Sequence, residues 1–307
     1  SSITPDTAIG SAISSADSRK FSKKPITPRP APRIPPNLEL AATTPHLLNV
    51  KPAGAYLMED VYYAGGLPAV LAEITDLLHL DALTVTGRTV GEELRSARVV
   101  NDDVIRPRDR ALHEGGSLAI LRGSLSPDGA ILKVSAASPR LLQHEGRAVV
   151  FANVDELHAT IDDPAQGIGP DDVLVLQNGG PVGAPGMPEY GHLPMPAALL
   201  KQGVTDMVRI SDARMSGTGF GTVVLHVAPE SAIGGPLALV QTGDRIRLDT
   251  AGRQLDLLVD EAELADRRRA WRPRPVADVR GYRGLYVRTV TQADRGCDLD
   301  FLVGRSA

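Results

Sequence analysis

Short runs of apolar residues, many alternating with polar ones, follow one another through most of the chain after residue 115. Such runs are typical of strands that bury at least one face. Turn sequences, such as SPDG at 126–129 and TGD at 242–244, separate several of them. The pattern predicts nine strands, at 117–121, 130–134, 147–151, 173–177, 204–210, 222–227, 237–240, 245–248 and 255–259. Many short strands with few crossovers favour a mainly β fold that closes, or nearly closes, into a barrel.

Helical periodicity is confined to a few segments. Apolar residues at 70, 71, 74, 77 and 78 share one face of a helix that begins after GGLP at 65–68. Further helices are predicted at 155–161, directly after Pro196, and at 261–271. The arginines of the last helix are more typical of a solvated face than of a nucleic-acid patch.

The stretch 178–236 holds the densest glycine and proline positions outside the N-terminal tail. Between 179 and 194 these residues exclude a regular helix or a central strand, so this part is predicted to be a loop. A second, polar loop at 211–221 is predicted to join two strands and to place its polar groups at their ends. Loops of this kind usually carry function.

Ser216 in the second loop fits no common catalytic motif. A nucleophile elbow would need glycine where Arg214 and Thr218 stand. The glycines at 217, 219 and 221 have a spacing found in dinucleotide loops, but a strand pattern follows where a helix is required. From the residues alone, a tight turn in which Ser216 and Thr218 bond nearby backbone groups remains the alternative to a functional site.

Longer stretches of the chain carry a family resemblance. They include LNVKPAGAYLMEDVYYAGGLP at 48–68, LTVTGRTVG at 83–91, GGSLAILRGSLSPDGAILKVSAA at 115–137, LPMPAALLKQGVTDMVRISDARMSGTGFGTVVLHVAPESAIGGP from 193, and GYRGLYVRTVTQADRGCDLDFL at 281–302. In this order they resemble the family of dihydroxy-acid, 6-phosphogluconate and sugar-acid dehydratases. The run RMSGT at 214–218 is more similar to the sugar-acid branch, which acts on arabinonate or xylonate, than to the branched-chain amino-acid branch.

The resemblance implies a hydro-lyase that converts a 2,3-dihydroxy acid, here a sugar acid, into a 2-keto-3-deoxy acid. Ser216 matches the serine that acts as an alkoxide base at C2, and Thr218 matches a hydroxyl beside the substrate. Glu189, in MPEYG at 187–191, matches a carboxylate that binds magnesium, which prefers hard oxygen ligands. The implied cofactors are a 2Fe–2S iron–sulfur cluster and Mg2+, and the implied fold of this part is a swivelling β-barrel domain.

The chain departs from the family in its metal ligands. The family's cluster needs three cysteines, whereas this chain has only Cys297, which matches none of the cluster positions. The sequence therefore suggests the C-terminal half of a dehydratase, with a tail at 1–43, a remnant of the α/β domain at 44–115 and a β-barrel domain at 116–307. Its expected partners are a small-molecule sugar acid and either the missing N-terminal half or further copies of the chain. The alternative is a non-catalytic β-domain with a binding or regulatory role, or a truncated inactive product.

Composition adds limits rather than a function. The chain is 42% hydrophobic and 23% charged, with a net charge of -4 and a pI near 6.0, which gives no electrostatic case for nucleic acid. No apolar run reaches the length of a membrane span, and a cytoplasmic location is expected. Residues 1–43 are rich in Ser, Pro and basic side chains and are predicted to be disordered, as a linker, tag or fusion junction rather than a transit peptide.

Overall fold

The computed structural model describes residues 44–189, 193–214, 219–274 and 280–302. Eight strands form one mixed sheet in the order β1-β2-β6-β5-β4-β3-β7-β8. Their bounds are β1 Leu118–Leu121, β2 Gly129–Lys133, β3 Gln143–Phe151, β4 Val173–Leu176, β5 Val208–Ser211, β6 Val223–Ala228, β7 Arg245–Asp249 and β8 Gln254–Leu257. Arg122, directly after β1, pairs with Gln254 of β8, so the two edge strands meet and the sheet is a nearly closed barrel. The predicted fold class, mainly β and barrel-like, is confirmed.

The helices are short. The α-helices are α2 Met58–Tyr63, α3 Gly66–Ala72, α4 Val90–Leu94, α5 Val154–Thr160, α6 Ala197–Lys201, α7 Glu261–Ala270 and α8 Gly281–Thr289. The 3-10 helices are η1 Thr75–Leu77, η2 Arg108–Arg110, η3 Val134–Ala136, η4 Pro139–Leu141, η5 Pro164–Gln166, η6 Ser231–Ile233, η7 Pro236–Leu239 and η8 Ala293–Arg295. Side chains start two of the α-helices: the Thr89 hydroxyl accepts from Glu92 N and the Asn153 amide oxygen accepts from Glu156 N.

Four neighbouring strands of the barrel, β3, β4, β5 and β6, run parallel. The register aligns Val150 with Val175 and Val175 with Ile210. Parallel neighbours need crossover connections, and α5 and α6 lie in the first two of these. Because the strands are parallel, their carboxyl ends meet at one edge of the sheet, where ligands bind in many α/β proteins.

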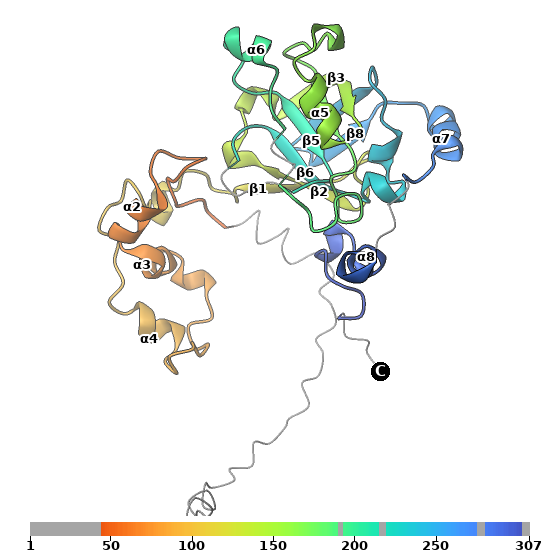
Figure 1. Cartoon of the computed structure of the whole chain (residues 1–307). Helices are drawn as coiled ribbons and strands as arrows, with labels where there is room; N and C mark the ends of the chain where they lie inside the picture. Colours follow the sequence, from red (N-terminus) through yellow and green to blue (C-terminus); the bar gives the residue numbers. More distant parts are fainter. Residues whose placement is uncertain (1–43, 190–192, 215–218, 275–279, 303–307) are drawn as a thin grey trace, which may run out of the picture. The chain divides into compact units, whose positions relative to one another are not determined.

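The middle strands are buried on both faces. Val173 and Val175 of β4 belong to the cluster that fills the barrel, whereas Leu174 and Leu176 pack in a second cluster with Leu157 of α5 and others. Figure 1 shows α5 lying against the strands. A continuous apolar run is the pattern expected of a strand covered on both sides. Full burial of each such Leu or Val contributes about 1.5–3 kcal/mol to folding.

Two element predictions are wrong. Residues 236–239 form the 3-10 helix η7 instead of a strand, because Pro236 lies at its first turn and Ala238 N donates to Gly235 O. The helix predicted through residue 78 ends at Ala72, since Ile74 leaves the helical region with φ -125° and ψ 27° before η1.

Residues 44–115 contain their own small core. Val61, Ala64, Ala69, Val104 and Ile105 are buried together. Several large apolar side chains of the same segment are exposed: Leu57, Met58, Tyr62, Tyr63, Leu67, Leu83 and Val85. Exposed apolar surface of this extent is typical of a face that another polypeptide segment covers. In the part of the chain that the structure describes, no helix is both long and apolar enough to cross a bilayer.

Candidate active site

Polar side chains follow three of the four parallel strands, β4, β5 and β6, at the shared carboxyl edge. Asn178 comes after β4, Asp212 after β5, and Glu230 and Ser231 after β6. The Asn178 amide nitrogen donates to the Ala152 carbonyl, directly after β3, at 2.9 Å. The ends of all four strands are therefore linked by hydrogen bonds through side chains.

Asp212 lies at the centre of these links. Its side chain is fully buried, and its carboxylate accepts from Gly179 N at 2.8 Å, from Ser231 N at 2.8 Å and from the Ser231 hydroxyl. The Ser231 hydroxyl in turn accepts from Asn178 N at 2.6 Å. Burial raises the pKa of Asp212 above its usual value, although the donors from Ser231 and Gly179 act in the opposite direction.

Glu230 binds the glycine-rich loop that starts at Asn178, through backbone groups further along that loop than Gly179. Its carboxylate accepts from Val182 N at 3.0 Å, from Gly183 N at 2.9 Å and from the Gln292 amide at 2.7 Å. Burial raises the pKa of Glu230, and the nearby negative charge of Asp212 acts in the same direction. The loop that starts at Asn178 is thus fixed by two buried carboxyl groups, one after β5 and one after β6.

Arg214 connects the loop after β5 to the segment that contains Glu189. Its Nε donates to the Met187 carbonyl, and its Nη1 lies 2.9 Å from the Glu189 carboxylate. Both side chains of the ion pair are partly exposed, 42% for Arg214 and 50% for Glu189, so the Glu189 carboxylate can be reached from solvent. The pair places a solvent-accessible hard oxygen ligand beside the loop after β5.

His226, in β6, pairs through its backbone with the residue that precedes Arg214. Its backbone has a positive φ of 54°, and its N–H donates to the Ala213 carbonyl at 3.1 Å. Burial lowers the pKa of His226, and the positive charge of Arg214 lowers it further.

The two hydroxyl residues to which the family resemblance assigns roles, Ser216 and Thr218, lie outside the described residues. The described parts of their loop are held firmly at each side. Asp212 begins it, and at the far end the Asp206 carboxylate accepts from Thr222 N and from the Thr222 hydroxyl. Arg209 also donates to the Phe220 carbonyl at 3.0 Å. Of the predicted site residues, the structure places Glu189 at the strand edge and gives no position for the other two.

The donors present fit magnesium only in part and do not fit an iron–sulfur cluster. Cys297 is the chain's one cysteine; its thiol lies 3.4 Å from the Met187 sulfur, and burial raises its pKa. One thiol that resists ionisation cannot hold a cluster that needs several thiolates. Within the described ranges, no three His, Cys, Asp or Glu side chains gather as a metal site. Glu189 offers one partly exposed carboxylate, which is fewer oxygen ligands than a magnesium site needs.

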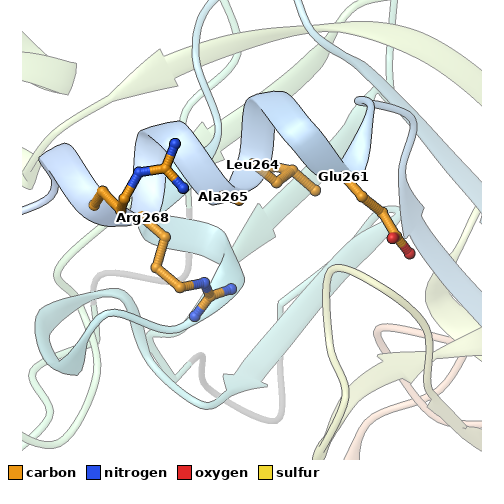
Figure 2. A pocket seen from close by; sticks show the side chains of 5 residues that line it. Glu261, Leu264, Ala265 and Arg268 are labelled. Carbon is orange, nitrogen blue, oxygen red and sulfur yellow. The ribbon is translucent and has the colours of Figure 1, made fainter.

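One surface depression, of about 510 Å3, is lined by Glu261, Leu264, Ala265, Arg268 and Arg269. Figure 2 shows these side chains projecting from a single helix, α7. A depression that one helix lines, with two arginines and one carboxylate, lacks the convergent polar groups of a small-molecule site. The strand edge is therefore the better candidate for chemistry.

Comparison with known proteins identifies the family. The C-terminal signature described as Dihydroxy-acid/6-phosphogluconate dehydratase C-terminal matches residues 103–297, and the corresponding N-terminal signature matches residues 37–93. The chain belongs to this dehydratase family. Enzymes of this family are hydro-lyases that use an iron–sulfur cluster and Mg2+. The family resemblance inferred from the sequence is confirmed.

Individual relatives include dehydratases named for sugar acids and for dihydroxy acids. The chain is 51% identical over 262 residues to the L-arabinonate dehydratase of Rhizobium leguminosarum bv. trifolii (strain WSM2304), covering 85% of this chain and 45% of the relative. It is 52% identical to the 6-deoxy-6-sulfo-D-gluconate dehydratase of Pseudomonas putida, over 85% of this chain and 46% of the relative. Identity to the dihydroxy-acid dehydratase of Ignicoccus hospitalis is 42%, over 86% of this chain and 48% of the relative. The chain spans about half the length of these relatives.

Sequence reasoning missed the buried carboxylates and the arginine at the strand edge. The polar loop predicted at 211–221 includes Asp212 and Arg214, and no role is predicted for Glu230. A signal was present, because each of the two acids follows a buried apolar strand within two residues of its end. An acid in that position is either solvated or bonded to backbone N–H groups, and only the fold distinguishes the two.

Proposed function

We propose that this chain is the base-bearing part of a hydro-lyase that removes water from a sugar acid with hydroxyls at C2 and C3. The contact of Arg214 with Glu189 is the observation that carries the proposal. It joins the loop that continues to Ser216 with the segment that holds the expected magnesium ligand. The sugar acids in the names of two relatives at 51% and 52% identity support the substrate class.

In this proposal Ser216, as its alkoxide, takes the C2 proton of the substrate. The electrons of the C2–H bond form a C2–C3 double bond as the C3–O bond breaks. The departing hydroxide becomes water by taking a proton from solvent, and Ser216 returns the C2 proton to solvent. The resulting enol then becomes a 2-keto-3-deoxy acid. Thr218 would orient a substrate hydroxyl, and Glu189 would supply one oxygen ligand to a magnesium ion, which would fix the substrate by electrostatic attraction.

The cluster that the family uses would have to be held by cysteines from outside this chain. Its contribution, when bound, is Lewis-acid assistance to the leaving hydroxyl. The chain's own residues supply the base, a magnesium ligand and the frame of loops that holds them. We therefore expect turnover only when the chain is completed by the N-terminal half of a family enzyme, or by an equivalent second polypeptide.

The test is to co-express the chain with the N-terminal half of the L-arabinonate dehydratase of Rhizobium leguminosarum and to load the complex with iron, sulfide and Mg2+. Size-exclusion chromatography first establishes that the halves associate. Formation of a 2-keto-3-deoxy acid from L-arabinonate is then measured beside a branched-chain dihydroxy acid. A loaded complex that dehydrates neither, or only the branched-chain acid, contradicts the proposal and favours a non-catalytic β-domain or the other branch.

The same complex tests the roles of the two hydroxyls. Ser216→Ala is expected to lower kcat about a hundredfold or more, because a positioned acid–base group is lost, while substrate and Mg2+ still bind. Thr218→Ala should lower kcat less, by about tenfold, since that hydroxyl takes no proton in the proposed step. Thr160→Ala serves as control, because its hydroxyl only donates to the Glu156 carbonyl within α5. Normal exchange of the C2 proton in Ser216→Ala would mean that another residue is the base.

A further inference from the structure

The buried carboxylate of Asp212 has no part in the chemistry proposed above, yet it is hydrogen-bonded to the loops after β4 and after β6. It is fully buried, and it accepts N–H or O–H groups from residues after β4 and after β6. A buried carboxylate is retained at a cost in desolvation unless several donors satisfy it. Here each donor belongs to a different strand-end loop from that of Asp212 itself.

The two segments that Asp212 joins both lead to the Arg214–Glu189 pair. Asp212 stands two residues before Arg214, and Gly179 begins the segment that reaches Glu189 ten residues later. The close packing of the two segments leaves no room for a side chain: a Cβ at position 179 would lie 2.7 Å from the Ala213 Cβ. A shift of the Asp212 carboxylate would therefore move both segments relative to each other.

Ser231, which follows β6, provides the remaining hydrogen bonds of this arrangement. Its hydroxyl donates to Asp212 and accepts from Asn178 N at 2.6 Å. The hydroxyl therefore bridges the loop after β5 and the loop after β4 through two hydrogen bonds. Its own N–H also donates to Asp212 at 2.8 Å. Ser231 is itself fully buried, with 1% of its surface exposed, and solvent cannot replace these contacts.

We propose that Asp212, with Ser231, is a positioning residue that sets the distance between the loop after β5 and the loop after β4. It thereby fixes the relative position of Arg214 and Glu189. It acts on the reaction only through the groups that these loops carry, and its effect on turnover rests on the proposed function. Misplacement of reacting groups by about 1 Å can cost about a hundredfold in rate.

Asp212→Asn keeps the size of the side chain but presents an amide N–H2 to the Gly179 or Ser231 N–H groups. Ser231→Ala is the milder variant, because it removes only one hydroxyl. Asp244→Asn is the matched control: the Asp244 side chain is 9% exposed and accepts from two Arg267 nitrogens at 2.6 and 2.9 Å, on the β7 side of the barrel. All three can be made in the full chain.

Hydrogen exchange measured by mass spectrometry on the full chain gives the first readout. In Asp212→Asn and in Ser231→Ala, amides at 178–183 and 230–234 should exchange at least about tenfold faster, whereas those of β3 and β7 keep their wild-type rates. Asp244→Asn should leave 178–183 unchanged. Unchanged exchange at 178–183 in Asp212→Asn would overturn the proposal, whether or not the completed enzyme is active.

Kinetics of the complex with the N-terminal half give the second readout. Asp212→Asn should lower kcat about tenfold to a hundredfold with KM within about threefold of wild type, and the double variant with Ser231→Ala should be no worse than Asp212→Asn alone. Equal losses in Asp212→Asn and Asp244→Asn would show a merely structural effect and overturn the positioning role. An inactive wild-type complex would count against the proposed function, and the exchange result would still decide on Asp212.

Discussion

Asp206 and Asp212 are two fully buried carboxylates on either side of β5, and their pKa values shift in opposite directions. Burial raises the pKa of both. At Asp206 the hydrogen bonds from Thr222 and Ser138 and the Arg209 guanidinium, 3.2 Å away, outweigh burial, and the pKa is lowered. At Asp212 burial prevails, since the described groups that act on it include hydrogen-bond donors but no cation.

The opposite shifts predict opposite pH dependences of stability. A carboxyl group with a lowered pKa in the folded state stabilises the fold above its unfolded pKa, and this contribution is lost as the pH falls through the folded value. The loss in the free energy of unfolding caused by Asp206→Asn should therefore be largest near pH 7. It should become progressively smaller as the pH falls below about 4, the usual pKa of an Asp side chain. For Asp212, ionisation in the folded state opposes folding, so the fold gains stability as the pH falls through its raised pKa. The decrease in the free energy of unfolding caused by Asp212→Asn should then be larger at acidic pH than at pH 7.

Urea unfolding of the full chain at a series of pH values measures both effects. The quantity to compare is the difference in the free energy of unfolding between each variant and the wild type. Asp244→Asn provides a third curve, from a carboxylate in a different part of the barrel. Parallel curves for Asp206→Asn and Asp212→Asn would contradict the assigned shifts.

At the scale of single elements, the strands were more predictable than what joins them. The runs that became β4 and β6 are apolar and β-branched, because these strands are buried on both faces or nearly so, and the pattern records that burial directly. The strand expected at 237–240 failed because the same apolar residues serve a 3-10 helix that points them into the barrel core. A short apolar run indicates burial more reliably than it indicates a strand.

The site was only partly predictable for a related reason. Glu189 could be proposed because a family motif surrounds it, and the structure places it at the strand edge. Its neighbour Arg214 comes from a loop 25 residues away, and no local pattern indicates their contact. The parallel arrangement of β4, β5 and β6 brings Asp212 and Ser231 together, and that arrangement is set by packing over the whole barrel.

The loop after β4 should tolerate no side chain at position 180. A Cβ there would lie 2.6 Å from Oε2 of Glu230 and 2.8 Å from its Cβ, and Glu230 is buried and hydrogen-bonded on both oxygens. Gly180→Ala is expected to lower the free energy of unfolding by about 1–3 kcal/mol, as other overpacked sites do. Gly169→Ala is the control, since the nearest atom to its added Cβ, an Asp172 carboxylate oxygen, is 3.8 Å away. Equal midpoints of thermal unfolding in the two variants would contradict this prediction, because they would mean that the Glu230 side chain moves to accommodate the added methyl group.

For the molecule as a whole, the chain spans about half the length of its relatives, and the described residues expose apolar side chains in the segment before the barrel. Family membership and barrel fold are established for this chain. The domain boundary near residue 115 remains a prediction, as do the roles of Ser216, Thr218 and Glu189. A metal site built from two polypeptide halves would show little affinity in one of them, because Mg2+ needs several ordered oxygen ligands.

Magnesium binding should therefore depend on the second half. We expect the chain alone to bind Mg2+ with a Kd weaker than about 1 mM by titration calorimetry, with no change in Glu189→Gln, because one carboxylate supplies too few ligands. In the complex with the N-terminal half, the affinity should rise and should fall again in Glu189→Gln. Glu145→Gln is the matched control, since Glu145 is 41% exposed and pairs with Arg245 at 3.2 Å elsewhere on the barrel. Micromolar affinity in the chain alone, lost in Glu189→Gln but not in Glu145→Gln, would show a site complete within this chain and would contradict the two-part arrangement.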